Sequence, residues 1–98
     1  MATHVVAWNF KDEVKEEDKK ALKTDMKKNL EALAGQIPEL LTVTFHTEPL
    51  PGSNREMALV TTHEKAEDIA VYGSHPAHVH VADTYVRPYT KDRACINF

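Results

Sequence analysis

The segment HVVAWNF, residues 4–10, is predicted to be a strand because β-branched and aromatic side chains dominate it, and this strand is apolar on both faces. Side chains alternate along a strand, so Val6 and Trp8 project to one side and Val5 and Ala7 to the other. A sheet that contains such a strand needs a cover on each of its faces. This requirement constrains the possible folds more than any other feature of the sequence.

The segment EMALVTTH, residues 56–63, repeats the two-sided pattern, with Met57 and Leu59 opposed to Ala58 and Val60. Helices in a chain of 98 residues cover only one face of a sheet, and no spare segment remains for the other face. A second copy packed sheet against sheet would cover it, so the sequence predicts a homodimer with two-fold symmetry. The alternative is that side chains this small tolerate exposure to water.

The other segments supply two more strands and the helices of an α+β fold. Apolar residues recur at intervals of three and four between Glu16 and Leu33, which predicts a helix that Gly35 ends. The remaining predicted elements are a strand at 40–47, short helices at 64–73 and 75–86, and a final strand at 93–98. The order β-α-β-β-α-β is typical of a ferredoxin-like antiparallel sheet, and we expect a single domain over residues 1–98.

Composition excludes several classes of function. With 28% charged residues and a net charge of -3, the chain has no basic stripe for nucleic acid, and the lysines of residues 11–28 alternate with acidic residues as on a solvated helix face. No apolar run is long enough for a membrane span or an export signal. Cys95 is the only cysteine and has no histidine near it in the sequence, so we expect a cytoplasmic protein without a cysteine nucleophile.

Histidines gather in the segment YGSHPAHVHV, residues 72–81. Pro76 is suited to the first position of a helix, which makes His75 the N-cap and places His78 in the first turn. The positive end of the helix dipole favours a neutral imidazole there, so His78 is a candidate general base. His78 and His80 lie about 200° apart around a helix and cannot share a metal ion, and we predict no metal site and no cofactor.

We predict a small apolar pocket with three polar tips, which gives catalytic roles to His78, Tyr72 and His4. Tyr72 would donate a hydrogen bond to a substrate oxygen and His4 would orient the substrate. The residues predicted to contact a small-molecule ligand are Val6, Trp8, Leu22, Met26, Met57, Leu59 and His75. The structural alternative makes His4 a frayed strand end, Tyr72 a core residue and His78 a helix-start residue bonded to backbone.

Three segments resemble the stress-responsive A/B barrel family, known as Dabb. They are HVVAWNFKDEV, IPELLTVTFHTEPL and VYGSHPAHVHVADTYVRP, and the HPAH sequence after a tyrosine is the most specific part. The resemblance covers essentially the whole chain. It implies a ferredoxin-like fold that pairs into a dimeric α+β barrel.

The family includes plant stress proteins without known chemistry and a polyketide cyclase that works without a cofactor. Tyr72 and His78 match the tyrosine and the histidine base of that cyclase, and His4 matches a further pocket histidine. Met57 stands where the cyclase has a histidine, and Trp8 where a smaller side chain is expected. The resemblance thus implies either a cofactor-free cyclase, isomerase or lyase acting on a small carbonyl compound, or a noncatalytic stress-related or ligand-binding protein.

Overall fold

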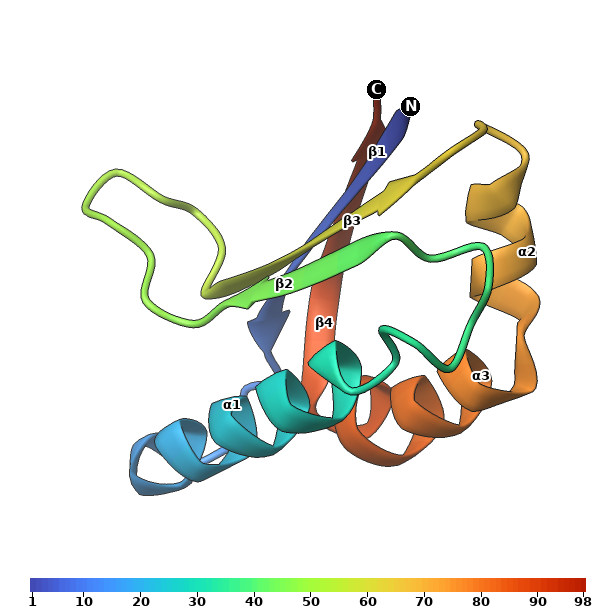
Figure 1. Ribbon diagram of the computed structural model, residues 1–98. Coiled ribbons are helices and arrows are strands. Elements are labelled where there is room, and N and C mark those ends of the chain that lie inside the picture. Colours follow the sequence, from blue (N-terminus) through green and yellow to red (C-terminus); the bar gives the residue numbers. More distant parts are fainter.

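In the computed structural model, which describes residues 1–98, four antiparallel strands form one sheet in the order β2-β3-β1-β4 (Figure 1). The strands are β1 (Ala2–Phe10), β2 (Thr42–His46), β3 (Met57–His63) and β4 (Thr90–Asn97). The helices are α1 (Glu16–Glu31), α2 (Asp68–Ser74) and α3 (Pro76–Val81), followed by a π-helical turn, η1 (Ala82–Val86), and a 3-10 turn, η2 (Arg87–Tyr89). This arrangement confirms the predicted ferredoxin-like α+β fold.

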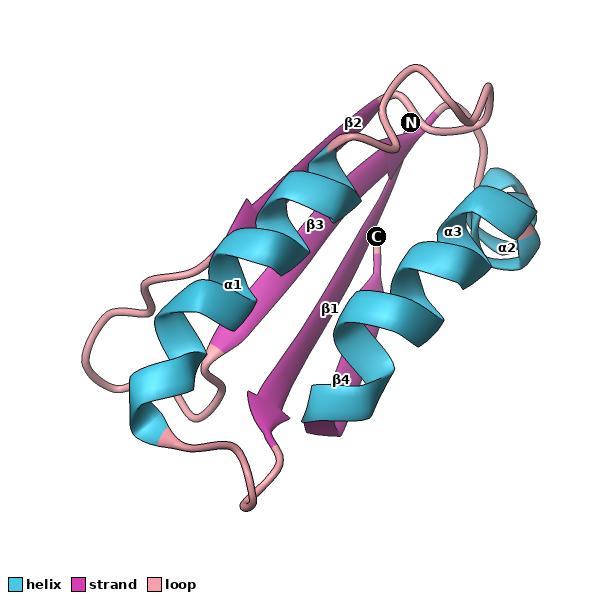
Figure 2. Cartoon of the chain, turned by 90° about the horizontal axis from the view of Figure 1, so that it is seen from below, coloured by secondary structure: helices cyan, strands magenta, loops and turns pink.

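The helices cover one face of the sheet, and Figure 2 shows α1 and α3 in front of the strands. Along β1 every residue on this face is buried, from Ala2 through Val6 to Phe10. Val5 and Ala7 point to the opposite face and are only half-buried. The two-sided pattern predicted for β1 is therefore confirmed, and β3 shows the same alternation.

No helix covers the opposite side of the sheet, which we call the outer face. Its apolar residues are Val5, Ala7, Ala58, Val60, Ala94 and Ile96. Ile96 pairs with Val5 across the two strands and exposes 56% of its surface. A contiguous apolar strip of this kind is left open to water in a single chain.

Helix α1 ends at Glu31, two residues before the predicted end at Leu33. The amide of Leu33 donates to the carbonyl of Leu30 at 3.1 Å, so the last turn tightens to i to i−3 bonding. Gly35, with a φ of 89°, belongs to the turn that follows. The tightened turn still directs Leu33 into the core, where only 1% of its surface is exposed.

The helix predicted over residues 75–86 is present, but its second half is π-helical, because α3 passes into the turn η1. In η1 the amide of Arg87 donates to the carbonyl of Ala82, a wider i to i−5 turn. Ala82 and Val86 are both buried in this turn. Two boundaries also differ, since α2 begins at residue 68 instead of 64 and β4 begins at residue 90 instead of 93.

Strand β4 contains a β-bulge opposite Trp8. Ala7 pairs with Ala94, whereas Asn9 pairs with Lys91. Between these two pairs β4 advances by three residues and β1 by only two. The extra residue changes which side chains of β4 face the helices.

Asp92 forms the bulge and has a φ of 54°, in the left-handed region. Arg55 Nε donates to the carbonyl oxygen of Asp92 at 2.8 Å, and Asn9 Nδ2 donates to its carboxylate at 3.1 Å. As a result Thr90, before the bulge, is buried under the helical layer, and Arg93, after it, also turns toward that layer.

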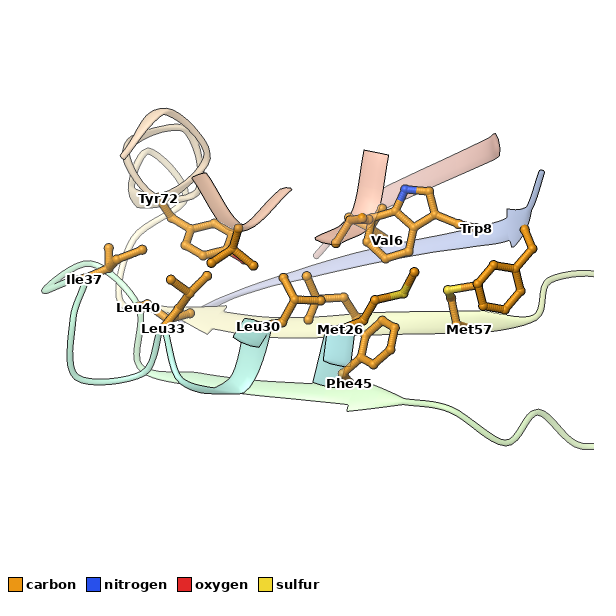
Figure 3. Packing of buried hydrophobic residues seen from close by; sticks show 14 residues of the cluster. Val6, Trp8, Met26, Leu30, Leu33, Ile37, Leu40, Phe45, Met57 and Tyr72 are labelled. Atoms are coloured by element: carbon orange, nitrogen blue, oxygen red, sulfur yellow. The ribbon is translucent and has the colours of Figure 1, made fainter. Parts of the chain in front are cut away.

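The buried core is an elongated cluster of fourteen residues between the sheet and the helices. Figure 3 shows Tyr72 at one end of this cluster and Met57 at the other, with Leu30 between them. Tyr72 and Met57 therefore occupy different parts of the core.

Charged side chains of α1 form hydrogen bonds with backbone groups on the free edge of β2, which is an edge strand of the sheet. Lys27 Nζ donates to the carbonyl of Phe45 at 3.0 Å, and Lys23 Nζ donates to the carbonyl of Thr47 at 2.7 Å. Glu31 accepts the amide of Phe45 at 3.0 Å. Lys27 remains exposed, as predicted for a solvated helix face, but it and the half-buried Lys23 also bind backbone carbonyls. None of the helices combines the length and the apolarity needed to cross a membrane.

Candidate active site

A cavity of about 290 Å³ lies between the sheet and the α2–α3–η1 segment, and eight of its thirteen lining residues are hydrophobic. Its polar lining includes His4 from β1 and, from the helical side, Tyr72 and His78. The structure thus brings together the three residues to which the sequence analysis gave catalytic roles. The volume is at the lower end of the range for small-molecule sites.

Tyr72 is the most unusual residue of the cavity. It exposes 1% of its surface, and its hydroxyl is buried without a hydrogen-bond partner. Burial raises the pKa of Tyr72 to about 12, so the phenol keeps its proton at neutral pH. A buried polar group without a partner is costly and rare, and one that lines a cavity is positioned to donate to a ligand.

His78 lies against Tyr72, with 4.5 Å between the ring centroids. Its Nδ1 is 2.9 Å from the carbonyl oxygen of Gly73. Because a carbonyl only accepts, Nδ1 carries the proton, and Nε2 of the neutral ring is the free acceptor.

Burial is the largest cause of a lowered pKa at His78, while the hydrogen bond to Gly73 opposes it and the positive charge of Arg87 adds to it. The sequence predicted a neutral imidazole because of the helix dipole, whereas in the structure burial is the main cause of the lowered pKa. Helix α3 is only six residues long.

His4 lies inside β1, because residues Thr3 and Phe98 exchange two backbone hydrogen bonds of 2.8 Å at the end of the sheet. A frayed strand end is therefore excluded. His4 Nδ1 is 2.6 Å from the amide oxygen of Asn97, which assigns the proton to Nδ1 and leaves Nε2 as an acceptor. Burial is the largest cause of a lowered pKa at His4, against the hydrogen bond with Asn97.

The cavity includes part of the predicted ligand-contacting set. Val6, Trp8 and Leu59 line it. His75 does not, because its Nδ1 accepts the amide of Ala77 at 3.1 Å and so caps α3 as the N-cap residue.

Three more residues predicted to contact a ligand, Leu22, Met26 and Met57, also lie outside the cavity lining. Helix α1 contributes Leu30 instead, and Leu22 lies about 12 Å earlier along the helix axis. Met26 and Met57 are buried in the core at 0% and 3% exposure. The cavity therefore lies near the C-terminal end of α1 and away from Met57.

The sequence analysis missed two arginines of the lining, Arg87 and Arg93. Arg87 reaches the cavity after the π-helical turn and Arg93 after the bulge, and neither irregularity has a periodic signal in the sequence. A turn-forming residue inside a strand, Asp92, is the one available hint of the bulge.

His63 is another missed residue, fully buried behind Tyr72 at 5.3 Å between ring centroids. Its Nδ1 is 2.8 Å from the carbonyl oxygen of Glu39, and its Nε2 is 2.8 Å from the hydroxyl of Thr61. Both nitrogens are thus satisfied, and His63 supports the Tyr72 ring from outside the cavity.

Cys95 has a histidine close to it in the fold, although none is near in the sequence. Pairing of β1 with β4 brings its sulfur to 3.7 Å from His4 Nδ1. That nitrogen donates to Asn97 and is no base for the thiol. Cys95 itself is exposed and outside the cavity lining.

A larger hollow of about 770 Å³ runs along α1, but no hydrophobic residue lines it. Lys19, in its wall, is paired with Glu16 and Glu56. No three His, Cys, Asp or Glu side chains in the chain are grouped to hold a metal ion. The apolar cavity at Tyr72 is therefore the candidate site.

The Stress Responsive A/B Barrel Domain (Dabb) family model matches residues 2–98. A dimeric protein of unknown function with a ferredoxin-like fold from Bacteroides fragilis is 25% identical, with a TM-score of 0.88 over 99% of this chain and 93% of that one. A dimeric ferredoxin-like protein of unknown function from Thermobifida fusca is 23% identical, with a TM-score of 0.75 over 99% and 88% of the two chains. A hydroxynitrile lyase from Passiflora edulis is 16% identical, with a TM-score of 0.70 over 99% and 90%. No curated protein matches the sequence.

Proposed function

Because the chain belongs to the stress-responsive A/B barrel domain family, we propose that its cavity carries cofactor-free acid–base chemistry on a small carbonyl compound, of the cyclase, isomerase or lyase type. The observation that carries this proposal is Tyr72, whose buried hydroxyl lacks a partner, next to the neutral imidazole of His78 in the lining of one cavity. The name of the Passiflora edulis structure adds that this fold holds a lyase.

In the proposed reaction, His78 Nε2 removes a proton from the carbon next to the carbonyl group. The electron pair of the broken C–H bond forms an enolate, and the hydroxyl of Tyr72 donates a hydrogen bond to the enolate oxygen. Return of the proton from His78 to another carbon of a conjugated enolate completes an isomerisation. In a cyclisation the enolate carbon attacks a second carbonyl group of the same molecule, and the new alkoxide oxygen takes the proton from His78. His4 Nε2 accepts a hydrogen bond from the substrate and orients it.

Exchange of the C3 protons of phenylpyruvate in D₂O, followed by proton NMR, tests the proposed base. We expect the His78→Asn variant to lose about 10² to 10⁴ of the catalysed rate, because a positioned general base contributes that much. His80→Asn is the matched control, since His80 is exposed on the same helix and outside the cavity lining. An unchanged rate in His78→Asn would refute the role of His78.

The second candidate is a noncatalytic ligand-binding or stress-related protein. The small volume of about 290 Å³ and the bulky Trp8 in its wall favour this alternative. Binding of phenylpyruvate without any catalysed exchange in the wild type would support it against the enzyme.

We also propose that two copies pair through the outer face. Its open apolar strip supports a homodimer, and the printed names of two similar structures describe those proteins as dimeric.

A further inference from the structure

We propose that the substrate is a carboxylate and that Arg93 binds its carboxylate group at the cavity. This inference rests on the proposed function, which requires a small carbonyl compound in the same cavity. It adds the chemical class of the part of the substrate that does not react.

Arg93 is a cation of the cavity lining without a counterion. The two arginines of the lining differ, because Arg87 is held by the carboxylate of Asp83 while Arg93 takes part in none of the ion pairs of the chain. Arg93 also makes no hydrogen bond through its side chain, in contrast to Arg55 nearby on the neighbouring loop. Its guanidinium therefore keeps all five donors for a ligand.

Strand alternation turns Arg93 toward the cavity, and the bulge in β4 allows Thr90 to face the same side. Asn97 and Cys95 face the same side as His4 and Val6, and Arg93 continues this alternation next to Trp8. Without the bulge the same alternation would run on to residue 91 and would leave Thr90 on the outer face. The local backbone cost at Asp92 thus allows both a buried Thr90 and an inward Arg93.

The distribution of groups in the cavity matches a molecule with an anionic end, an apolar middle and a carbonyl. A planar guanidinium fork suits a carboxylate, which it binds through two parallel hydrogen bonds. Val6, Trp8 and Leu30 supply the apolar wall. Tyr72 and His78 supply the donor and the acceptor for the carbonyl end.

The positive charge of Arg93 reaches the imidazoles of the site. It contributes to the lowered pKa of His4 and, more weakly than burial and Arg87, to that of His78. A bound carboxylate would neutralise this charge beside the reacting groups.

Benzoate and its neutral analogue benzamide test the carboxylate class by binding alone, measured by NMR titration of the full chain. We expect benzoate to bind the wild type about tenfold more tightly than benzamide, in keeping with a charge-assisted hydrogen-bonded pair. Arg93→Gln should remove this preference and leave the affinity for benzamide within about twofold. Arg93→Lys should keep only part of the preference, because an ammonium lacks the fork.

Lys91→Gln is the matched control, since it removes the same charge from an exposed residue of the same strand outside the cavity lining. We expect it to leave both affinities unchanged. Equal binding of benzoate and benzamide to the wild type, a lack of benzoate binding, or equal losses for both compounds in Arg93→Gln would overturn the inference. Inorganic phosphate that displaces benzoate at equal concentration would also overturn it, because the site would then serve phosphorylated ligands.

The inference and the proposed function fail in different ways. Benzoate selectivity that depends on Arg93, together with exchange that does not depend on His78, would keep the carboxylate site and remove the enzyme. The opposite result is exchange that depends on His78 but is equally fast with phenylpyruvate and the neutral ketone phenylacetone, in both the wild type and Arg93→Gln. That result would keep the enzyme and remove the carboxylate site.

Discussion

At the scale of single residues, the site depends on two carbonyl oxygens, one of the backbone and one of a side chain, which fix the tautomers of its two histidines. The carbonyl oxygen of Gly73 holds the proton of His78 on Nδ1, and the amide oxygen of Asn97 does the same for His4. Both Nε2 atoms are then acceptors, while the hydroxyl of Tyr72 is the unsatisfied donor. A ligand with both a carbonyl oxygen and an acidic hydrogen complements these groups.

Replacement of Tyr72 by Phe should separate stability from activity. The variant removes a buried hydroxyl that has no partner, so we expect the free energy of unfolding to rise by about 1 kcal/mol in urea titrations. The exchange rate of phenylpyruvate should fall by about 10², because the donor to the enolate is lost. Tyr85→Phe, a half-buried tyrosine outside the cavity lining, is the control. A Tyr72→Phe protein that is less stable than the wild type would show that the hydroxyl has a partner.

The two cavity histidines predict how stability depends on pH. Burial lowers the pKa of His4 and of His78 below the ordinary 6.5, so below about pH 6.5 the unfolded chain binds more protons than the folded one. We expect stability to fall as the pH drops from about 6.5 toward the lowered values, and to be insensitive to these groups above about pH 7.

Urea denaturation across this pH range measures the effect. In the double variant His4→Asn and His78→Asn the decrease between about pH 6.5 and pH 5 should be shallower, because two titrating groups are gone. A slope that is identical in the variant and the wild type would contradict the proposed burial of both rings.

The residues predicted from sequence to have catalytic roles do meet in one cavity, and the reason is periodicity. His4 follows the alternation of β1, and Tyr72 and His78 flank a break that Pro76 and His75 make visible. His63 lies on the same kind of alternation in β3, and Arg93 lies on the alternation of Cys95 and Asn97, so both were open to prediction in this way. Arg87 was not, because it follows a π-helical turn that only the folded chain shows.

At the scale of elements, strand order and helix positions follow from hydrophobic patterns, whereas the irregular turns do not. The π-helical turn η1 and the bulge in β4 each add one residue to a regular repeat, and residues 90–93 around the bulge include no apolar side chain whose spacing could reveal it. Arg87 follows the π-helical turn in the cavity lining, and the bulge lets Thr90 face the same side as Arg93. Regular periodicity therefore cannot place Arg87.

The bulge predicts an unusual order of stabilities at position 92. Asp92 has a φ of 54°, a conformation that costs most residues about 1 to 2 kcal/mol but is natural for Gly and tolerated by Asn. We expect Asp92→Ala to lower the free energy of unfolding by about 1 kcal/mol, and Asp92→Gly and Asp92→Asn to change it little. Chemical denaturation of the three variants measures the order. Equal losses for Ala and Gly would mean that the side-chain contact with Asn9 dominates.

At the scale of the whole molecule, the sheet has one covered and one open side. The helices bury the side that includes Val6 and Leu59, while the outer face exposes Val60 and Ile96 in part. Burial of that face against a second copy would remove apolar surface from water in both subunits. The open apolar face was predictable from the alternation in β1 and β3 alone, whereas the geometry of the proposed pairing was not.

A charge on the outer face should separate the proposed dimer. We expect Val60→Asp to convert a species of twice 11.1 kDa into one of 11.1 kDa in analytical ultracentrifugation, because an unpaired carboxylate cannot be buried at low cost. Thr84→Asp, on the exposed side of η1, is the control and should leave the mass unchanged. A wild type that sediments as a stable monomer would rule out the pairing.

The charged side chains of α1 at β2 have a consequence for how these molecules can associate. Lys23, Lys27 and Glu31 already occupy the backbone groups of Phe45 and Thr47 that a foreign strand would need. Growth of the sheet by edge-to-edge addition is therefore blocked on that flank, which is a common defence against amyloid-like aggregation. The apolar outer face can thus stay available for the proposed second copy, while the β2 edge of the sheet resists addition of further strands.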